Sequence, residues 1–331
     1  MVELSPEVTA LLEPVSTGAA PWDPRDRVLG QVVQAWPTAA AADVAIVGVP
    51  FDTAVLGRRG ARFGPAAIRA ALYRAYTWGG ELGVDLAEDL RLADCGDVRV
   101  AHTSVERTHA RLRRVVAAVA ASGAVPCVLG GDNSLSFATI AGLLDATGGS
   151  LGLVVLDAHH DLREPHDGEI NSGTPYRRVL ELPGEPVRPE YMVQIGLAPF
   201  RNSRHYAAHA RALGLHLIPA RAVHQQGPEA VAAQALAVAT AAPGGRFFLS
   251  VDLDVCDPAF APGTSAHSPG GLLPFEVLEL VLALARHPGC AGFDLVETAP
   301  PLDVQAATSE LAATVVLYFL AGRALARRAA A

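Results

Sequence analysis

The chain contains no lysine. All 26 of its basic residues are arginines, and 34 acidic residues outnumber them, which gives a formal net charge of −8. A protein that binds nucleic acid in general carries an excess of positive charge, because cations neutralise the phosphate backbone. We therefore expect no nucleic acid among the partners of this protein.

Cysteine is scarce, and long apolar runs are absent. The four cysteines lie far apart and form no Cys-x-x-Cys pair, which argues against a zinc knuckle. Few cysteines without a pairing pattern fit a reducing, cytoplasmic setting. The sequence shows no signal peptide, and no uninterrupted apolar run reaches the roughly 18 residues that span a bilayer. We expect no membrane association.

Short apolar segments and helical patterns alternate along most of the chain. Half of the 331 residues are hydrophobic, so a large core can form. Most apolar segments are continuous, as expected of strands buried on both faces. The predicted strands are residues 44–49, 90–94, 125–129, 151–156, 192–196, 215–218, 247–251 and 291–296. The predicted helices are residues 65–75, 105–121, 134–145, 203–213, 228–241, 274–286 and 309–326. The alternation predicts an α/β fold, with a mainly parallel sheet between two layers of helices.

The first 40 residues differ from the rest. They show no regular periodicity, and we expect them to form an irregular arm packed on the body. Prolines and tryptophans are frequent there: Pro14, Pro21, Trp22, Pro24, Trp36 and Pro37. No linker or repeat divides the remaining sequence, so we expect a single domain over residues 41–331.

Two of the predicted strands end in acidic residues at alternate positions. Asp157, His159 and Asp161 follow the strand at 151–156, and Asp252 and Asp254 follow the strand at 247–251. Alternate residues of an extended segment point the same way, and unpaired charges are costly to bury. A single pair of this kind can equally be a helix cap or a solvated loop. Two such sets predict a metal cluster, and oxygen and nitrogen ligands suit Mn²⁺.

Polar residues follow two further strands. The motif Gly130-Gly131-Asp132-Asn133-Ser134 follows the strand at 125–129, and Glu297 follows the strand at 291–296. Ligands of open parallel sheets bind outside the carboxyl ends of the strands. Four strand ends therefore direct polar groups to one edge of the sheet, which favours a two-metal site.

Taken together, these motifs resemble the ureohydrolase superfamily of arginases, agmatinases and formimidoylglutamases, over about residues 44–322. The resemblance implies a three-layer α/β/α sandwich around an eight-stranded, mainly parallel sheet. It also implies two Mn²⁺ ions bridged by a hydroxide, and a homo-oligomer, either a trimer or a hexamer. The implied metal ligands are Asn133, Asp157, His159, Asp161, Asp252 and Asp254.

The chain departs from the common pattern of that superfamily at two positions. Most members have histidine where Asn133 stands, and an amide oxygen is the weaker ligand, so we expect one ion to bind loosely. The alternative is that Asn133 only caps the following helix. Ser172 stands where many arginases and agmatinases have a histidine that is assigned a proton shuttle.

These departures resemble one branch of the formimidoylglutamases. Asn133, the pair His159-His160 and the segments 173–178 and 200–206 all fit that branch. Its members hydrolyse N-formimidoyl-L-glutamate to L-glutamate and formamide in histidine degradation. The resemblance implies that Asp161 is both a ligand and a proton relay, and that Glu297 holds the cationic amidinium.

The two carboxylates of such a substrate need cationic partners, which arginine forks supply. Arg163, two residues beyond Asp161, is a candidate for substrate binding, and so are Ser172 and Arg201. Further arginines expected at the rim are Arg177 and Arg178. The alternative for any rim arginine is a solvated surface role. His160 should point away from His159 and is interpreted as structural, and His267 is a candidate rim residue.

Two other functions remain open at this point. One is an agmatinase or another guanidino-acid hydrolase that releases urea. The other is a metal-poor pseudoenzyme that serves as a binding or regulatory subunit, which the missing histidines at Asn133 and Ser172 suggest.

Overall fold

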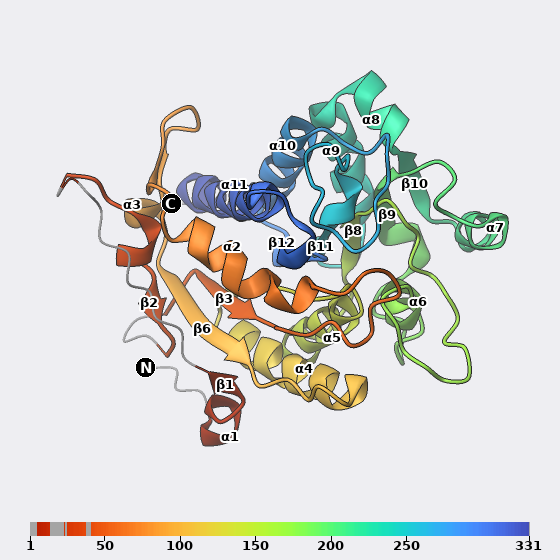
Figure 1. The fold of residues 1–331 in the computed structure, drawn as a ribbon, viewed down its shortest axis with the longest axis horizontal. Coiled ribbons are helices and arrows are strands. Elements are labelled where there is room, and N and C mark those ends of the chain that lie inside the picture. The colour runs from red at the N-terminus through yellow and green to blue at the C-terminus, as the bar shows by residue number, and fades with distance from the viewer. Residues whose placement is uncertain (1–4, 14–22, 24, 38–40, 331) are drawn as a thin grey trace.

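Ten strands form one sheet at the centre of the protein (Figure 1). This computed structural model describes residues 5–13, 23, 25–37 and 41–330. The strand order is β1-β6-β3-β7-β12-β11-β8-β9-β10, with β2 also paired to β6, and every pair is parallel except β1 with β6. The strands are β1 (Leu12–Glu13), β2 (Gln34–Ala35), β3 (Val44–Gly48), β6 (Leu92–Val98), β7 (Val125–Leu129), β8 (Gly152–Leu156), β9 (Met192–Leu197), β10 (His216–Pro219), β11 (Phe247–Asp252) and β12 (Cys290–Val296).

All eight predicted strands are present, and the mainly parallel sheet is confirmed. The two additional strands, β1 and β2, have two residues each and add to the edge formed by β6. Segments this short carry no periodicity, which is why the sequence predicted eight strands instead of ten. A separate hairpin joins β4 (Trp78–Gly79) to β5 (Val84–Asp85).

Helices cover both faces of the sheet, so the three-layer α/β/α architecture is confirmed (Figure 1). One apolar core contains side chains of α2 (Gly64–Leu72), α8 (Ala220–Gln226), α9 (Pro228–Ala239), α10 (Pro274–Ala285) and α11 (Ala307–Ala330). The core on the other face contains side chains of α1 (Pro6–Thr9), α4 (Val105–Ala121), α5 (Leu135–Thr147), α6 (Pro175–Leu180) and α7 (Arg204–Leu213). The short helix α3 (Leu86–Asp89) follows β5.

Local signals explain several helix boundaries. Ser104 and Ser203 accept hydrogen bonds from backbone N–H groups in the first turns of α4 and α7. Helix α7 ends at Leu213 and is followed by Gly214, which adopts a left-handed φ of 84°. Helices α6 and α8 have only six and seven residues and were not predicted, because such lengths give little helical periodicity.

Helix α11 has 24 residues and is, by length and composition, apolar enough to cross a membrane. The sequence had shown no uninterrupted apolar run of the length that spans a bilayer. The helix packs against α2 and α10, and 61% of its most apolar window is buried inside the protein. Burial against neighbouring helices therefore accounts for its apolar character. No second helix in the described part of the chain meets the same criteria.

The described parts of the first 40 residues lie against the β6 edge of the sheet. Leu12 pairs with Val98, and Gln34 pairs with Ala93. Pro14, Pro21, Trp22 and Pro24 fall outside the described residues. We retain a boundary near residue 40 as a proposal.

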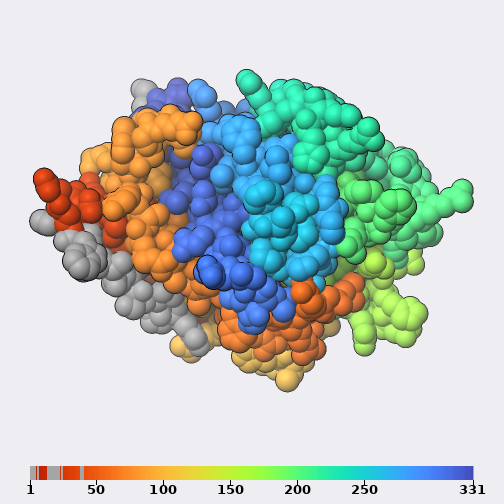
Figure 2. Space-filling view, turned by 45° about the horizontal axis from the view of Figure 1, so that its top comes forward, coloured from red at the N-terminus to blue at the C-terminus, as the bar shows by residue number. Residues whose placement is uncertain are grey.

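Loops that are far apart in the sequence meet on one face of the molecule. In Figure 2, segments near residues 55–65, 255–275 and 295–305 lie side by side. Arg58 donates a hydrogen bond to the backbone oxygen of Thr264 at 2.8 Å, which ties the first two segments together. A Cβ on Gly60 would lie 3.1 Å from Pro301, so the first and third segments are in contact.

Candidate metal centre and active-site pocket

Four neighbouring strands carry predicted site residues to the carboxyl edge of the sheet. The neighbouring strands are β7, β12, β11 and β8. Asn133 follows β7, Glu297 follows β12, Asp252 is the last residue of β11, and Asp157 follows β8. The chain turns directly after each strand, which keeps these side chains at the edge. The topology therefore brings together residues that are up to 164 positions apart.

Two groups of potential ligand atoms lie at this edge. Asp157, His159 and Asp254 form one group, and Asp157, Asp161 and Asp252 form the other. Within each group all ligand atoms lie within 4.8 Å of one another. Because the groups share Asp157, the arrangement would suit two divalent cations held close together.

Backbone amides hold three of these carboxylates in place. The N–H of His159 donates to Asp157 Oδ1 at 2.6 Å, and the N–H of Asp254 donates to Asp252 Oδ1 at 2.9 Å. The N–H of Ala158 donates to Asp254 Oδ1 at 3.3 Å. One oxygen of each carboxylate is thereby fixed, and the other can face a cation.

The backbone is strained at two site residues. Asp161 and Glu297 have φ values of 46° and 64°, in the left-handed region that non-glycine residues seldom adopt. Such conformations persist where the surrounding structure enforces them, and they cluster at functional sites. The neighbouring Gly131 is required sterically, since a Cβ there would lie 1.6 Å from the backbone oxygen of Phe51.

The electrostatics of the cluster call for positive charge. Burial, together with repulsion from neighbouring carboxylates, raises the pKa of Asp157, Asp252 and Glu297 well above their ordinary values. Burial raises the pKa of Asp161 to about 6, with His159 opposing the shift. Although burial alone would lower it, Asp254 and Asp157 raise the pKa of His159 to about 12.

The donor set therefore fits divalent cations. Glu297 accepts a hydrogen bond from the Asn133 N–H at 2.9 Å, whereas its buried Oε2 has no partner among the described residues. His159 is the only cationic candidate within 4.0 Å of the described carboxylates of the cluster, at 3.1 Å from Asp254. Buried acids without compensation are costly, and hard oxygen-liganded cations would supply that compensation.

Asn133 lies between the cluster and a buried polar network. Its Nδ2 donates to Asp161 Oδ2 at 2.8 Å and to Asp157 Oδ2 at 3.2 Å, while its Oδ1 accepts from the Ser136 hydroxyl at 2.9 Å. In this orientation the nitrogen of the amide faces the cluster. A rotation of 180° would direct the oxygen to the cluster instead. Ser134, and not Asn133, occupies the N-cap position of α5.

A cavity of about 310 Å³ opens above the cluster. The three predicted substrate-binding residues Arg163, Ser172 and Arg201 all line it. Arg163 lies over the ring of Tyr206 at 5.6 Å, and Ser172 Oγ accepts a hydrogen bond from the Leu56 N–H at 3.0 Å. The remaining lining residues are Leu56, Gly57, His159, Asp161, Gly173, Phe200, Asp252, Asp254, Ser265, Ala266 and Glu297.

The other arginines expected at the rim lie elsewhere. Arg177 forms ion pairs with Glu164 and Glu181, and it does not line this cavity. Arg178 packs over the ring of Phe137 at 3.6 Å. Both sit on helix α6, which was not predicted, and its geometry directs their side chains away from the cavity.

The two further histidines have structural contacts. His160 is buried and contacts Gln194 Oε1 through Nδ1 at 2.7 Å, as its structural interpretation predicts. His267 contacts Arg58 at 2.7 Å beside the cavity wall. Leu56 and Ser265 were not predicted to line the cavity, because loop residues of these types carry no motif. Phe200 belongs to the segment 200–206, but no role was predicted for its side chain.

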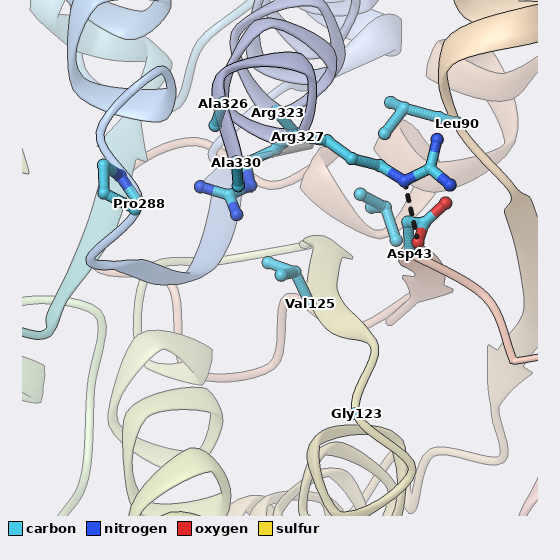
Figure 3. A pocket seen from close by; sticks show the side chains of 10 residues that line it. Asp43, Leu90, Gly123, Val125, Pro288, Arg323, Ala326, Arg327 and Ala330 are labelled. Atoms are coloured by element: carbon cyan, nitrogen blue, oxygen red, sulfur yellow. Dashed lines mark ion pairs between the residues drawn. The ribbon is translucent and has the colours of Figure 1, made fainter.

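A second pocket at the opposite edge of the sheet has a different character (Figure 3). Helix α11 supplies Arg323 and Arg327 to it, and Arg327 approaches Asp43 at 3.6 Å. Arg323 donates to the backbone oxygens of Ala285 and His287. The charged groups of this pocket therefore have partners within the chain. Among the described residues, no cluster of potential metal ligands occurs there.

Comparison with known proteins decides the family. A family model described as "Arginase family" matches residues 42–322. The chain belongs to the arginase family. Family membership and the two ligand groups together indicate a binuclear metal site at the carboxyl edge of the sheet.

Several arginase-family relatives are similar over almost their whole length. A formimidoylglutamase of Halobacterium salinarum is 39% identical, over 91% of this chain and 95% of its own. The structure of formimidoylglutamase from Bacillus subtilis has a TM-score of 0.86 and 32% identity, and the match covers 93% of this chain and 95% of that one. A structure of Trypanosoma cruzi formiminoglutamase with Mn²⁺ has a TM-score of 0.82 and 29% identity, with 90% and 99% covered.

Proposed function

We propose that this protein hydrolyses N-formimidoyl-L-glutamate to L-glutamate and formamide. The observation that carries the proposal is the pair Arg163 and Arg201 on the wall of a cavity whose floor is acidic. Neither arginine has an acidic partner within 4.0 Å among the described residues. The cavity lining therefore combines acidic residues with two arginines that form no ion pair among the described residues.

This distribution of charge matches the substrate. The formimidoyl group is a cationic amidinium at neutral pH, and the glutamate part carries two carboxylates. Glu297 at the floor can hold the amidinium, and Arg163 and Arg201 can each pair with a carboxylate. Ser172 Oγ accepts a hydrogen bond from the Leu56 N–H. Its own hydroxyl proton remains available, so Ser172 can donate a hydrogen bond to the substrate.

We further propose that the resident ions are two Mn²⁺, held by Asp157, His159, Asp161, Asp252 and Asp254. When bound, such a pair would lower the pKa of a water molecule and stabilise negative charge as it develops on the substrate. A relative's structure is described with Mn²⁺, which supports the choice of metal. Asn133 is the proposed sixth ligand and requires its amide oxygen to face the cluster.

The roles of the remaining residues follow from their positions. Asp161 would accept a proton at its carboxylate and pass it to the departing nitrogen of glutamate. Hydrolysis consumes one water, breaks the bond between the formimidoyl carbon and that nitrogen, and leaves formamide. Glu297 would keep the amidinium carbon in place during the attack, because its carboxylate is fixed by the Asn133 N–H.

Hydrolysis of guanidino compounds is the second candidate. Chicken mitochondrial agmatinase is 32% identical, and the Bacillus subtilis formimidoylglutamase is 33% identical, so identity alone separates the classes weakly. Agmatine would place its terminal amine, a cation, against Arg163 and Arg201. That repulsion disfavours agmatine, and a guanidino acid would occupy only one of the two arginines.

A substrate panel tests the proposal. Purified protein with added Mn²⁺ is assayed for formamide and glutamate from formimidoylglutamate, and for urea from agmatine, arginine, guanidinopropionate and guanidinobutyrate. We expect product from formimidoylglutamate alone. Urea from agmatine without turnover of formimidoylglutamate would reject the proposal. Less than about one Mn²⁺ per chain, with no turnover of any substrate after Mn²⁺ is added, would support the metal-poor pseudoenzyme. We also propose a homo-oligomeric assembly and a cytoplasmic location.

A further inference from the structure

A buried polar network lies directly beneath the metal-binding cluster. Asp294 on β12 accepts a hydrogen bond from Ser250 Oγ at 2.6 Å, and Ser250 Oγ lies 3.0 Å from the Tyr176 hydroxyl. The Tyr176 hydroxyl lies 3.3 Å from Asn133 Oδ1, and Ser136 Oγ lies 2.9 Å from the same atom. All five residues have no exposed surface. A continuous path of polar groups therefore connects a buried carboxylate to the Asn133 amide.

The proton count along this path restricts its direction. Each hydroxyl has one proton to donate. When Ser250 donates to Asp294, its oxygen can accept from Tyr176 at 3.0 Å or from Ser136 at 3.4 Å. With Tyr176 as the nearer donor, the Tyr176 oxygen is left as an acceptor. An acceptor at that position favours the NH₂ group of Asn133 turned toward Tyr176. The amide oxygen of Asn133 then faces Asp157 and Asp161.

The structure shows the opposite arrangement at Asn133. Its NH₂ group donates to Asp157 and Asp161, and its oxygen accepts from Ser136 and Tyr176. That arrangement suits a cluster of carboxylates by itself, because the amide supplies donors to them. Positive charge at the cluster would reverse the preference, since an oxygen and not an NH₂ group is attracted to a cation. The amide therefore has two orientations that the surroundings can satisfy.

We propose that Asp294 is a positioning residue which, through the hydroxyls of Ser250 and Tyr176, turns the amide oxygen of Asn133 toward the metal centre. Burial raises the pKa of Asp294 to about 7, and above that pH its ionised carboxylate can only accept hydrogen bonds, so it then fixes their direction. The free Oδ2 of Asp294 has no partner among the described residues, which is costly for a purely structural side chain. This inference rests on the proposed metal centre but not on the identity of the substrate.

The test measures Mn²⁺ affinity by titration, without any substrate. Asp294→Asn keeps the shape of the side chain but can donate as well as accept, so the path loses its fixed direction. Groups that orient metal ligands typically contribute 10- to 100-fold to affinity. We expect about a 10-fold weaker Kd for the more loosely held Mn²⁺ in Asp294→Asn, and a similar loss in Ser250→Ala. The matched control is Thr139→Val, which removes another buried hydroxyl of α5, one bound to the Leu135 backbone oxygen.

Two further measurements separate positioning from a structural role. The urea midpoint of metal-free Asp294→Asn should equal or exceed that of the wild type, because a buried charge is removed. In an Asn133→Ala background, Asp294→Asn should no longer change Mn²⁺ affinity, because the amide that it orients is gone.

An unchanged Kd in Asp294→Asn would overturn the inference. So would an equal loss of affinity with and without the Asn133 side chain. A protein that shows the expected pattern but does not turn over formimidoylglutamate would reject the proposed substrate and leave this inference intact.

Discussion

The pocket beside Asp43 at the amino edge of the sheet and the metal-binding cluster at its carboxyl edge treat charge in opposite ways. At the amino edge, the half-buried Asp43 accepts three hydrogen bonds from Arg91, one from its backbone N–H at 2.8 Å and two from its guanidinium at 2.7 and 3.1 Å, and it also lies near Arg327. At the carboxyl edge, Asp157, Asp252 and their acidic neighbours have no arginine within 4.0 Å among the described residues. Both edges are rich in loops and both have a pocket.

The difference teaches how to separate structural charge from functional charge. The opposite charges of pairs such as Asp43 and Arg91 compensate each other within the chain, so no bound ligand is needed. Burial, together with mutual repulsion, raises the pKa of the uncompensated acids Asp157 and Asp252, so they require a compensating cation from outside the chain. Pocket size does not make this distinction, because the two cavities are about 270 and 310 Å³.

The largest effect is expected at the carboxyl edge from Asp252→Asn. This change removes a proposed ligand while the shape of the side chain is kept. We expect metal content to fall and kcat/KM to drop by at least about 10²- to 10³-fold, the size of effect seen when a central electrostatic group is lost. Metal analysis and a formamide assay measure both. The control Asp145→Asn, which breaks the exposed pair with Arg113, should keep full activity. Full activity in Asp252→Asn would contradict the contrast between the two edges of the sheet.

The next effect concerns the arginines that face the acidic floor. Arg163→Ala should raise KM for formimidoylglutamate by about 10- to 100-fold, since a hydrogen bond to a charged group contributes about 1.5–3 kcal/mol. Metal content should not change, because Arg163 is on the cavity wall and not among the ligand groups. Arg188→Ala, at an exposed arginine paired with Glu190, serves as the control. Unaltered kinetics would show that Arg163 does not bind the substrate.

The sequence predicted the carboxyl edge better than it predicted its surroundings. The strands and the acidic residues at their ends were identifiable because continuous apolar runs and alternate charges are local patterns. The positions of Arg177 and Arg178 could not be predicted, because they depend on helix α6, whose six residues give no periodic signal. The orientation of a side chain on a short helix is decided by packing.

The polar network beneath the cluster was also missed. Asp294 interrupts an apolar strand, and a charge at such a position was the one available signal. Its partners come from three other elements: Ser250 on β11, Ser136 on α5 and Tyr176 on α6. Contacts of this kind depend on how distant segments meet, which spacing in one sequence does not reveal.

Metal removal should destabilise the protein in a way that depends on pH. Burial raises the pKa of Asp161 to about 6 without metal, against about 3.9 in an unfolded chain. The stability that this group contributes is present below the unfolded pKa and is lost as the pH rises through about 6. Mn²⁺ binds the ionised carboxylate and restores stability.

The gap in Tm between protein with Mn²⁺ and protein with a chelator should therefore widen by several degrees from about pH 5 to about pH 7.5. Thermal unfolding across this range measures it, and Asp161→Asn should show a flatter gap. A gap of constant size in the wild type would contradict the assignment of Asp161 to the metal centre.

The smallest effect is expected at the amino edge, and its pH dependence has the opposite sign. Burial opposes the shift, but Arg91 holds the pKa of Asp43 below its ordinary value. The stability that Asp43 contributes is therefore present above the unfolded pKa and is lost as the pH falls through the folded one. Asp43→Asn should cost about 1 kcal/mol at neutral pH, or about 2 °C in Tm, with unchanged metal content and kinetics. In acid the variant and the wild type should converge. A loss of metal binding in Asp43→Asn would show that the two edges are coupled, and that charge compensation alone does not separate structure from function.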